Sequence, residues 1–168
     1  MNHTDDSIPH VLMSLAAELK ARGWMLTTAE SCTGGLIAAA CTEMAGSSEW
    51  FERGFVTYAN AAKTELLGVS ADLIATEGAV SEAVVRGMAQ GAAARAHTQV
   101  SVAVTGVAGP TGGSPSKPVG TVWLGWWVAG TLTAECHHFE GDRAAVRRAT
   151  VRCALQGLHQ RVLVDQAV

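Results

Sequence analysis

The sequence lacks the signatures of several large classes of protein. No apolar run reaches the roughly 18 residues that a membrane span needs, and no apolar segment follows a basic start as in a signal peptide. We therefore expect a cytoplasmic protein that does not use a membrane. The formal net charge of -3 also lacks the basic excess typical of nucleic-acid binding, so no nucleic-acid partner is expected.

Paired cysteines and common phosphate-binding motifs are missing as well. The four cysteines form no CxxC pair, which argues against a zinc site and against a disulfide framework. No GK[ST] follows a glycine-rich turn, and the GxGxxG spacing does not occur, which excludes the fingerprints of P-loop and dinucleotide-binding folds. We expect no metal and no organic cofactor.

What is present fits one compact α/β domain over residues 1–168. The chain is 48% hydrophobic and contains 18 glycines, which suits a buried core connected by tight turns. Periodicity predicts helices over 8–22, 36–44, 60–68, two within 70–97, and 142–162, and strands over 24–30, 50–59, 99–106, 121–130 and 131–140. The two helices within 70–97 are each expected to be opened by a serine cap, Ser70 and Ser81. This order predicts an α/β fold, a three-layer α/β/α sandwich with a mixed sheet of about five strands.

Three polar or glycine-rich segments follow predicted strands or close them: "ESCTGG", "TYAN" and "TGVAGPTGG". In α/β sheets, ligands bind at the carboxyl ends of parallel strands. The clustering of these segments is therefore the first indication of a functional site.

The segment "ESCTGG" allows two interpretations. Ser31 or Thr33 can cap the following helix while Gly34 and Gly35 permit close packing. Alternatively, free N–H groups at the helix start can cradle a phosphate or carboxylate, with Glu30 opposing the anion unless its side chain points elsewhere.

Cys32 also lies at this predicted helix start, where a thiol pKa can be lowered. A catalytic cysteine needs a base, and no evident histidine partner exists. His137 and His138 lie on a predicted strand with opposite facings, so at most one of them could reach a site.

The stretch "GSSEWFERGFVTYANAAK" brings a serine and a lysine into one segment. A lysine kept neutral by desolvation can act as the base that activates a serine, here Ser47 or Ser48 with Lys63. The structural alternative is a serine that caps a turn and a lysine on a solvated helix face.

A long glycine- and proline-rich loop follows Thr105 and Gly106, and its backbone N–H groups could bind an oxyanion or a phosphate. Lys117 lies in this loop and could add a charge. Asp142 is the predicted cap of the last helix, and Arg143 at its start could hold a phosphate, although its arginines mostly indicate a solvated face.

Taken in order, the segments "TTAESCTGGLIAAA", "AGSSEWFERGFVTYANAAKTELLGV", "GAVSE", "VAVTGVAGPTGGSPSKPVGTVW" and "GDRAAVRRAT" closely resemble the CinA C-terminal-domain family. The resemblance covers nearly the whole chain. It implies a mixed α/β/α sheet, commonly a homodimer, and hydrolysis of nicotinamide mononucleotide to nicotinate mononucleotide and ammonia.

The resemblance also implies roles for individual residues. Ser48 resembles the amidase nucleophile and Lys63 its general base, with Ser31 as the alternative nucleophile. Tyr58 and Thr105 would line the site, and "ESCTGG" would border the ligand. The implied catalytic set is Ser48, Lys63 and Tyr58. The implied substrate-binding set is Ser31, Cys32, Thr33, Gly34, Thr105, Gly106 and Arg143.

Two other classes of function remain open at the level of sequence. A module that senses a nucleotide without hydrolysing it would use the same cradle. A partner-docking domain linked to DNA uptake would act through its surface, although the acidic charge balance argues against direct DNA binding.

Overall fold

The structure, a computed structural model, describes residues 7–165. The predicted single domain over residues 1–168 therefore extends beyond the described part at both ends. Helices and strands alternate in the first part of the chain, and three consecutive helices and three consecutive strands follow before the last helix. They are α1 (Ile8–Arg22), β1 (Leu26–Glu30), α2 (Leu36–Thr42), the 3₁₀ turn η1 (Ser47–Glu49), β2 (Phe51–Val56), α3 (Asn60–Leu67), α4 (Ala71–Glu77), α5 (Glu82–Ala96), β3 (Val100–Gly106), β4 (Thr121–Val128), β5 (Thr131–His138) and α6 (Arg143–Val164).

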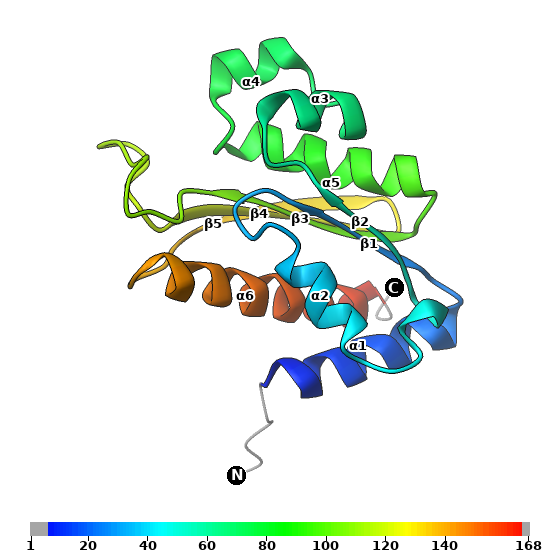
Figure 1. Cartoon of the computed structure of the whole chain (residues 1–168). Helices are drawn as coiled ribbons and strands as arrows, with labels where there is room; N and C mark the ends of the chain where they lie inside the picture. Colours follow the sequence, from blue (N-terminus) through cyan, green and yellow to red (C-terminus); the bar gives the residue numbers. More distant parts are fainter. Residues whose placement is uncertain (1–6, 166–168) are drawn as a thin grey trace.

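The strands form one mixed sheet in the order β2-β1-β3-β4-β5. Strand β1 is parallel to both of its neighbours, whereas β4 is antiparallel to β3 and to β5. Helices α3, α4 and α5 cover one face, and α1, α2 and α6 cover the other (Figure 1). The predicted three-layer α/β/α sandwich with a mixed five-stranded sheet is confirmed.

Each face of the sheet has its own hydrophobic core. The core under α6 contains Trp126, which is fully buried and donates its indole N–H to the Ala154 carbonyl at 2.9 Å. The core under α5 contains Met88 and several alanines, whose small side chains let the helix lie close to the sheet. Burial on both faces of the sheet explains the largely apolar sequences of the central strands β3 and β4.

Helix caps follow local sequence signals in three places. Ser70 and Ser81 each accept a hydrogen bond from a backbone N–H of the first helical turn at 3.3 Å, and Asp142 accepts one at 2.8 Å. These three caps confirm the predicted starts of α4, α5 and α6. None of the described helices is long and apolar enough to cross a membrane.

The topology brings several chain segments to one edge of the sheet. The carboxyl ends of β1, β2 and β3 meet there, because these three strands are parallel. The loop over 107–120 leaves β3 at this edge, and α3 and α6 begin beside it (Figure 1). The clustering predicted for "ESCTGG", "TYAN" and "TGVAGPTGG" is therefore present.

Candidate active site

The turn after β1 is organised by a buried carboxylate. Glu30 is fully buried and accepts hydrogen bonds from Thr33 Oγ1 at 2.6 Å, from the Ile37 N–H at 2.8 Å and from the Ala38 N–H at 3.0 Å. The carboxylate therefore satisfies the amides at the start of α2, where a negative charge is favoured.

This arrangement corrects both sequence-based interpretations of the helix start. Neither Ser31 nor Thr33 caps α2, whose N-cap is Gly35 and makes no side-chain cap bond. Nor are the amides of the first turn free to cradle a ligand, because the chain's own Glu30 holds two of them. Gly34 and Gly35 have φ values of +59° and +107°, so the turn requires residues that adopt left-handed conformations.

Lys63 projects from α3 to the same turn and is 1% exposed. Its Nζ atom lies 3.1 Å from Ser31 Oγ, 2.8 Å from the Thr57 carbonyl oxygen and 3.2 Å from the Tyr58 carbonyl oxygen. No ion pair within residues 7–165 involves Lys63. The amine is therefore buried among uncharged partners.

This environment favours the neutral amine. Burial lowers the pKa of Lys63, and the nearby Cys32 opposes that shift only in part. A neutral amine has two N–H donors and one lone pair. Because the Thr57 and Tyr58 carbonyls can only accept, they would take the two donors of the neutral amine, whose lone pair would then face the hydroxyl of Ser31.

Sheet register explains why Ser31 and Lys63 meet. In the parallel pair of β1 and β2, Glu30 is the register partner of Val56, so the residues that follow the two strands lie side by side. Ser31 follows β1, and Thr57, whose carbonyl binds Lys63, follows β2. The link is reinforced by a 2.9 Å hydrogen bond from the Thr57 N–H to the Glu30 carbonyl.

A cavity of about 200 Å³ opens beside this pair. It is lined by Ser31, Cys32, Tyr58, Asn60, Lys63, Ala79, Val80, Thr105, Gly106, Ala108 and Arg143. Hollows of about 550 and 560 Å³ lie elsewhere in the described part, but neither contains a buried ionisable side chain. The buried amine of Lys63, rather than the cavity volume, therefore identifies the smaller cavity as the candidate site.

Arg143 and Tyr58 form one side of the cavity. The Arg143 guanidinium donates to the Gly109 carbonyl at 3.0 Å and to Tyr58 Oη at 3.2 Å. Both side chains are exposed, and Asn60 beside them is exposed too. These polar groups at the rim are available to the polar part of a ligand that enters the cavity.

Thr105 and Gly106 close the cavity at the end of β3. Thr105 is 1% exposed and donates its hydroxyl to the Ala79 carbonyl at 2.9 Å, which holds the connection between α4 and α5 against the sheet. A Cβ atom at Gly106 would lie 2.8 Å from the Thr121 carbonyl oxygen, so only glycine fits there. Lys117 does not reach this cavity, and it donates to the Glu77 carbonyl at 2.9 Å.

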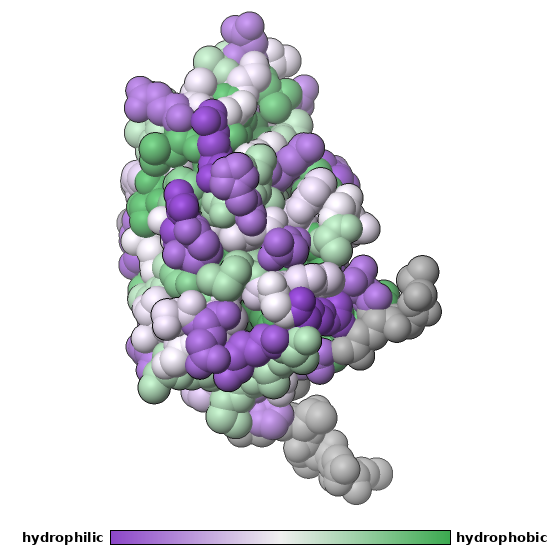
Figure 2. Space-filling view, turned by 90° about the vertical axis from the view of Figure 1, so that its right-hand side faces the viewer, coloured by the Kyte–Doolittle hydropathy of each residue, from purple (hydrophilic) through white to green (hydrophobic). Residues whose placement is uncertain are grey.

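The predicted pairing of Ser48 with Lys63 is not formed. Ser48 is exposed and lies in η1, before β2, whereas Lys63 follows β2. A strand of six residues spans about 20 Å, so the two residues lie near opposite ends of β2. Figure 2 shows the side of the molecule on which β2 begins, and hydrophilic and hydrophobic residues are interspersed there.

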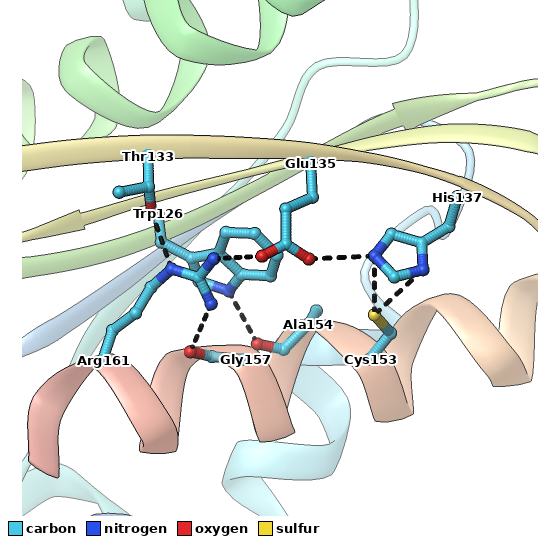
Figure 3. A network of polar contacts seen from close by, with 8 residues as sticks. All are labelled: Trp126, Thr133, Glu135, His137, Cys153, Ala154, Gly157 and Arg161. Carbon is cyan, nitrogen blue, oxygen red and sulfur yellow. Dashed lines mark hydrogen bonds and ion pairs between the residues drawn. The ribbon is translucent and has the colours of Figure 1, made fainter. Parts of the chain in front are cut away.

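The structure argues against a nucleophilic thiol. Burial raises the pKa of Cys32 to about 11, which outweighs the backbone contribution that sequence position suggested. Neither predicted histidine lines the cavity. His137 instead lies 3.0 Å from Glu135 and within 3.9 Å of the Cys153 sulfur, in a network between β5 and α6 (Figure 3).

Arg147 is a site neighbour that sequence reasoning assigned to a solvated face. Its guanidinium donates to the carbonyls of Cys32 and Thr33 at 3.2 and 3.1 Å. In the sequence, only the spacing of one helical turn between Arg143 and Arg147 indicates that the two side chains lie on the same face of the helix. Val80 was missed as well, since no motif marks it, and Asn60 lies in the predicted segment "TYAN" but was given no role of its own.

Comparison with known proteins identifies the family. The model of the CinA C-terminal domain matches residues 10–162. The chain belongs to the CinA C-terminal domain family. The resemblance noted from the sequence is therefore confirmed.

Several members of the CinA C-terminal domain family are similar over nearly their full length. The nicotinamide-nucleotide amidohydrolase PncC of Pseudomonas putida is 53% identical, with 92% of this chain and 97% of the relative covered. The protein of the same name from Escherichia coli K12 is 50% identical, with 95% and 98% covered. The crystal structure of the competence/damage inducible protein CihA from Agrobacterium tumefaciens has a TM-score of 0.87 at 44% identity, with 94% and 96% covered.

Proposed function

We propose that this chain is a nicotinamide-nucleotide amidohydrolase that converts nicotinamide mononucleotide to nicotinate mononucleotide and ammonia, with Ser31 as nucleophile and Lys63 as general base. The relatives that carry this name support the reaction. The observation that carries the residue assignment is the 3.1 Å contact between Ser31 Oγ and a buried lysine amine with no ionic partner among the described residues.

In the first half of the proposed reaction, Ser31 Oγ attacks the carboxamide carbon while its proton passes to the neutral Lys63 amine. The resulting tetrahedral oxyanion needs hydrogen-bond donors. The N–H of Cys32 is a suitable donor, because it follows the nucleophile and donates to no main-chain carbonyl in the described part of the chain. Lys63 then gives its proton to the leaving nitrogen, ammonia departs, and an ester to Ser31 remains.

In the second half, water attacks the ester carbon and Lys63 accepts the proton of that water. The ester bond breaks, Ser31 Oγ recovers the proton from Lys63, and the nicotinate carboxylate is released. Every proton therefore passes through one amine, whose lowered pKa suits both directions of transfer.

The cavity also supports a placement for the rest of the substrate. Its volume of about 200 Å³ is smaller than a typical pocket for a drug-sized ligand, so we place the pyridine ring inside and the ribose phosphate at the rim. Arg143 lies at that rim and can offer further N–H groups to the phosphate.

Single substitutions test the choice of serine. Ser31→Ala should abolish ammonia release from nicotinamide mononucleotide, because the attacking oxygen is lost, whereas Ser48→Ala should retain wild-type turnover. Ammonia and nicotinate mononucleotide are measured together on purified protein. Full turnover by Ser31→Ala, or loss of turnover in Ser48→Ala, would overturn the assignment. Ligand-dependent stabilisation without ammonia release from the wild type would instead support a nucleotide-binding module.

The proposal includes a homodimer, as the family resemblance implies, and a reducing cytoplasm as its location, which the unpaired cysteines favour. Light scattering of the purified chain tests the assembly. A monomer at working concentration would contradict it.

A further inference from the structure

Arg147 reaches from α6 to the back of the turn that carries Ser31. Its Nε donates to the Cys32 carbonyl at 3.2 Å, and its Nη2 donates to the Thr33 carbonyl at 3.1 Å. Within residues 7–165 no ion pair involves this guanidinium. An arginine fork that bonds two successive carbonyls fixes the orientation of both peptide planes.

Contacts within the turn hold it as well. Thr33 is anchored twice, since its hydroxyl donates to Glu30 while its carbonyl accepts from Arg147. The turn is closed by a 3.0 Å hydrogen bond from the Gly34 N–H to the Ser31 carbonyl. The position of Ser31 Oγ beside Lys63 therefore depends on a turn that both Glu30 and Arg147 hold.

Arg147 itself does not line the cavity, whereas Arg143, one turn earlier on α6, does. Contact with substrate is thus expected for Arg143 and not for Arg147. This difference separates a binding role from a positioning role on the same helix.

We propose that Arg147 is a positioning residue that holds Ser31 in line with Lys63 for attack. The inference rests on the proposed Ser31 and Lys63 amidohydrolase reaction. Because a displacement of about 1 Å can cost about a hundredfold in rate, loss of the fork should lower kcat strongly. KM should hardly change, because no substrate contact is removed.

The test compares kcat and KM of four proteins with nicotinamide mononucleotide. Arg147→Ala should lower kcat by about a hundredfold with KM within about twofold. Arg147→Lys keeps the charge but cannot bond both carbonyls as a rigid fork, so an intermediate loss of about tenfold is expected. Arg148→Ala is the matched control, since Arg148 is the exposed neighbour on α6. It should behave as the wild type.

Chemical rescue provides a readout that a purely structural role would not move. Added methylguanidinium should raise kcat of Arg147→Ala several-fold and leave Arg148→Ala unchanged. Thermal unfolding establishes that each variant is folded at the assay temperature. If Arg147→Ala is not folded there, Arg147→Lys carries the test by its kcat against an unchanged KM.

Several results would overturn the inference. They are a wild-type kcat in Arg147→Ala or in a folded Arg147→Lys, a defect confined to KM, or a folded Arg147→Ala that methylguanidinium does not rescue. The proposed function fails in a different way, which is a wild-type protein that releases no ammonia or a Ser31→Ala variant that retains turnover.

Discussion

Two polar clusters lie near the two ends of α6, and they differ in whether their charged side chains have a partner of opposite charge. In the network near its carboxyl end, Arg161 donates to Glu135 at 2.6 Å, Glu135 contacts His137 at 3.0 Å, and the guanidinium lies 3.8 Å from the ring centroid of Trp126 (Figure 3). Near its amino end, Lys63 of α3 is buried with a hydroxyl and two carbonyls only.

The difference in partners predicts a difference in role. Hydrogen bonds from His137 and then Arg161 stabilise the ionised form of Glu135, so this network lowers the pKa of Glu135 and holds β5 to α6. A cation among neutral groups loses hydration without compensation, so Lys63 is held toward its neutral, reactive form. We therefore expect the cluster with paired charges to stabilise the fold, and we assign the chemistry to the cluster in which the charge is unpaired.

The largest expected effect comes from removing the unpaired amine. Lys63→Met should lower kcat by about 10³- to 10⁴-fold, because the general base is lost. Lys63→Arg tests the same point with the charge retained, since a guanidinium does not deprotonate and cannot accept the proton of Ser31. Steady-state ammonia release measures both variants. Substantial activity in Lys63→Arg would contradict the catalytic role that distinguishes the Lys63 cluster from the Arg161 cluster.

The pH dependence of the wild type provides the next test. The active form contains neutral Lys63, so kcat should rise with pH through its lowered pKa and level off below the value of about 10.4 for an exposed lysine. Protonation of Lys63 is disfavoured in the folded state relative to the unfolded state. The unfolding free energy should therefore also rise with pH between the folded and unfolded pKa values. Lys63→Met should lack this rise, and an identical pH slope in Lys63→Met would contradict it.

The sequence predicted the elements whose signals are local. Ser70, Ser81 and Asp142 stand directly before apolar periodic segments, and each caps a helix as expected. The clustering of three segments at one edge of the sheet was also predictable, since parallel strands end together.

The predicted contact between Ser48 and Lys63 is absent for a physical reason. Ser48 and Lys63 are close in sequence, but the whole of β2 separates them in space. Ser31 is more distant in sequence and adjacent in space, because β1 and β2 are parallel and in register.

The support of the Ser31 turn was beyond the reach of sequence patterns. Glu30 turns back to bind the start of α2, and Arg147 contacts Cys32 across 115 positions of sequence. The Arg147 contact depends on how α6 packs on the sheet, and residue spacing in the sequence does not reveal that packing.

Breaking the paired cluster should affect stability and not catalysis. Arg161→Ala removes the contact with Trp126 and the hydrogen bonds to Thr133 and Glu135, so the unfolding free energy should fall by about 2 kcal/mol. Denaturant unfolding measures this loss, and kcat should remain at the wild-type value. A large fall in kcat in a folded Arg161→Ala protein would show that the two clusters are coupled through α6.

The smallest expected effect lies at the exposed end of the same network. Hydrogen bonds from His137 and then Arg161 lower the pKa of Glu135, so its contribution to stability is present above the pKa of an unfolded glutamate, about 4.3, and is lost as pH falls through the lower folded value. The carboxylate side chain is 49% exposed, so solvent screens the pair and Glu135→Gln should cost less than about 1 kcal/mol at neutral pH. Comparing denaturant unfolding of the wild type and Glu135→Gln at neutral and acidic pH measures this, and the difference should shrink as the pH is lowered. A difference that grew in acid would mean that Glu135 is held by something other than its contacts with His137 and Arg161.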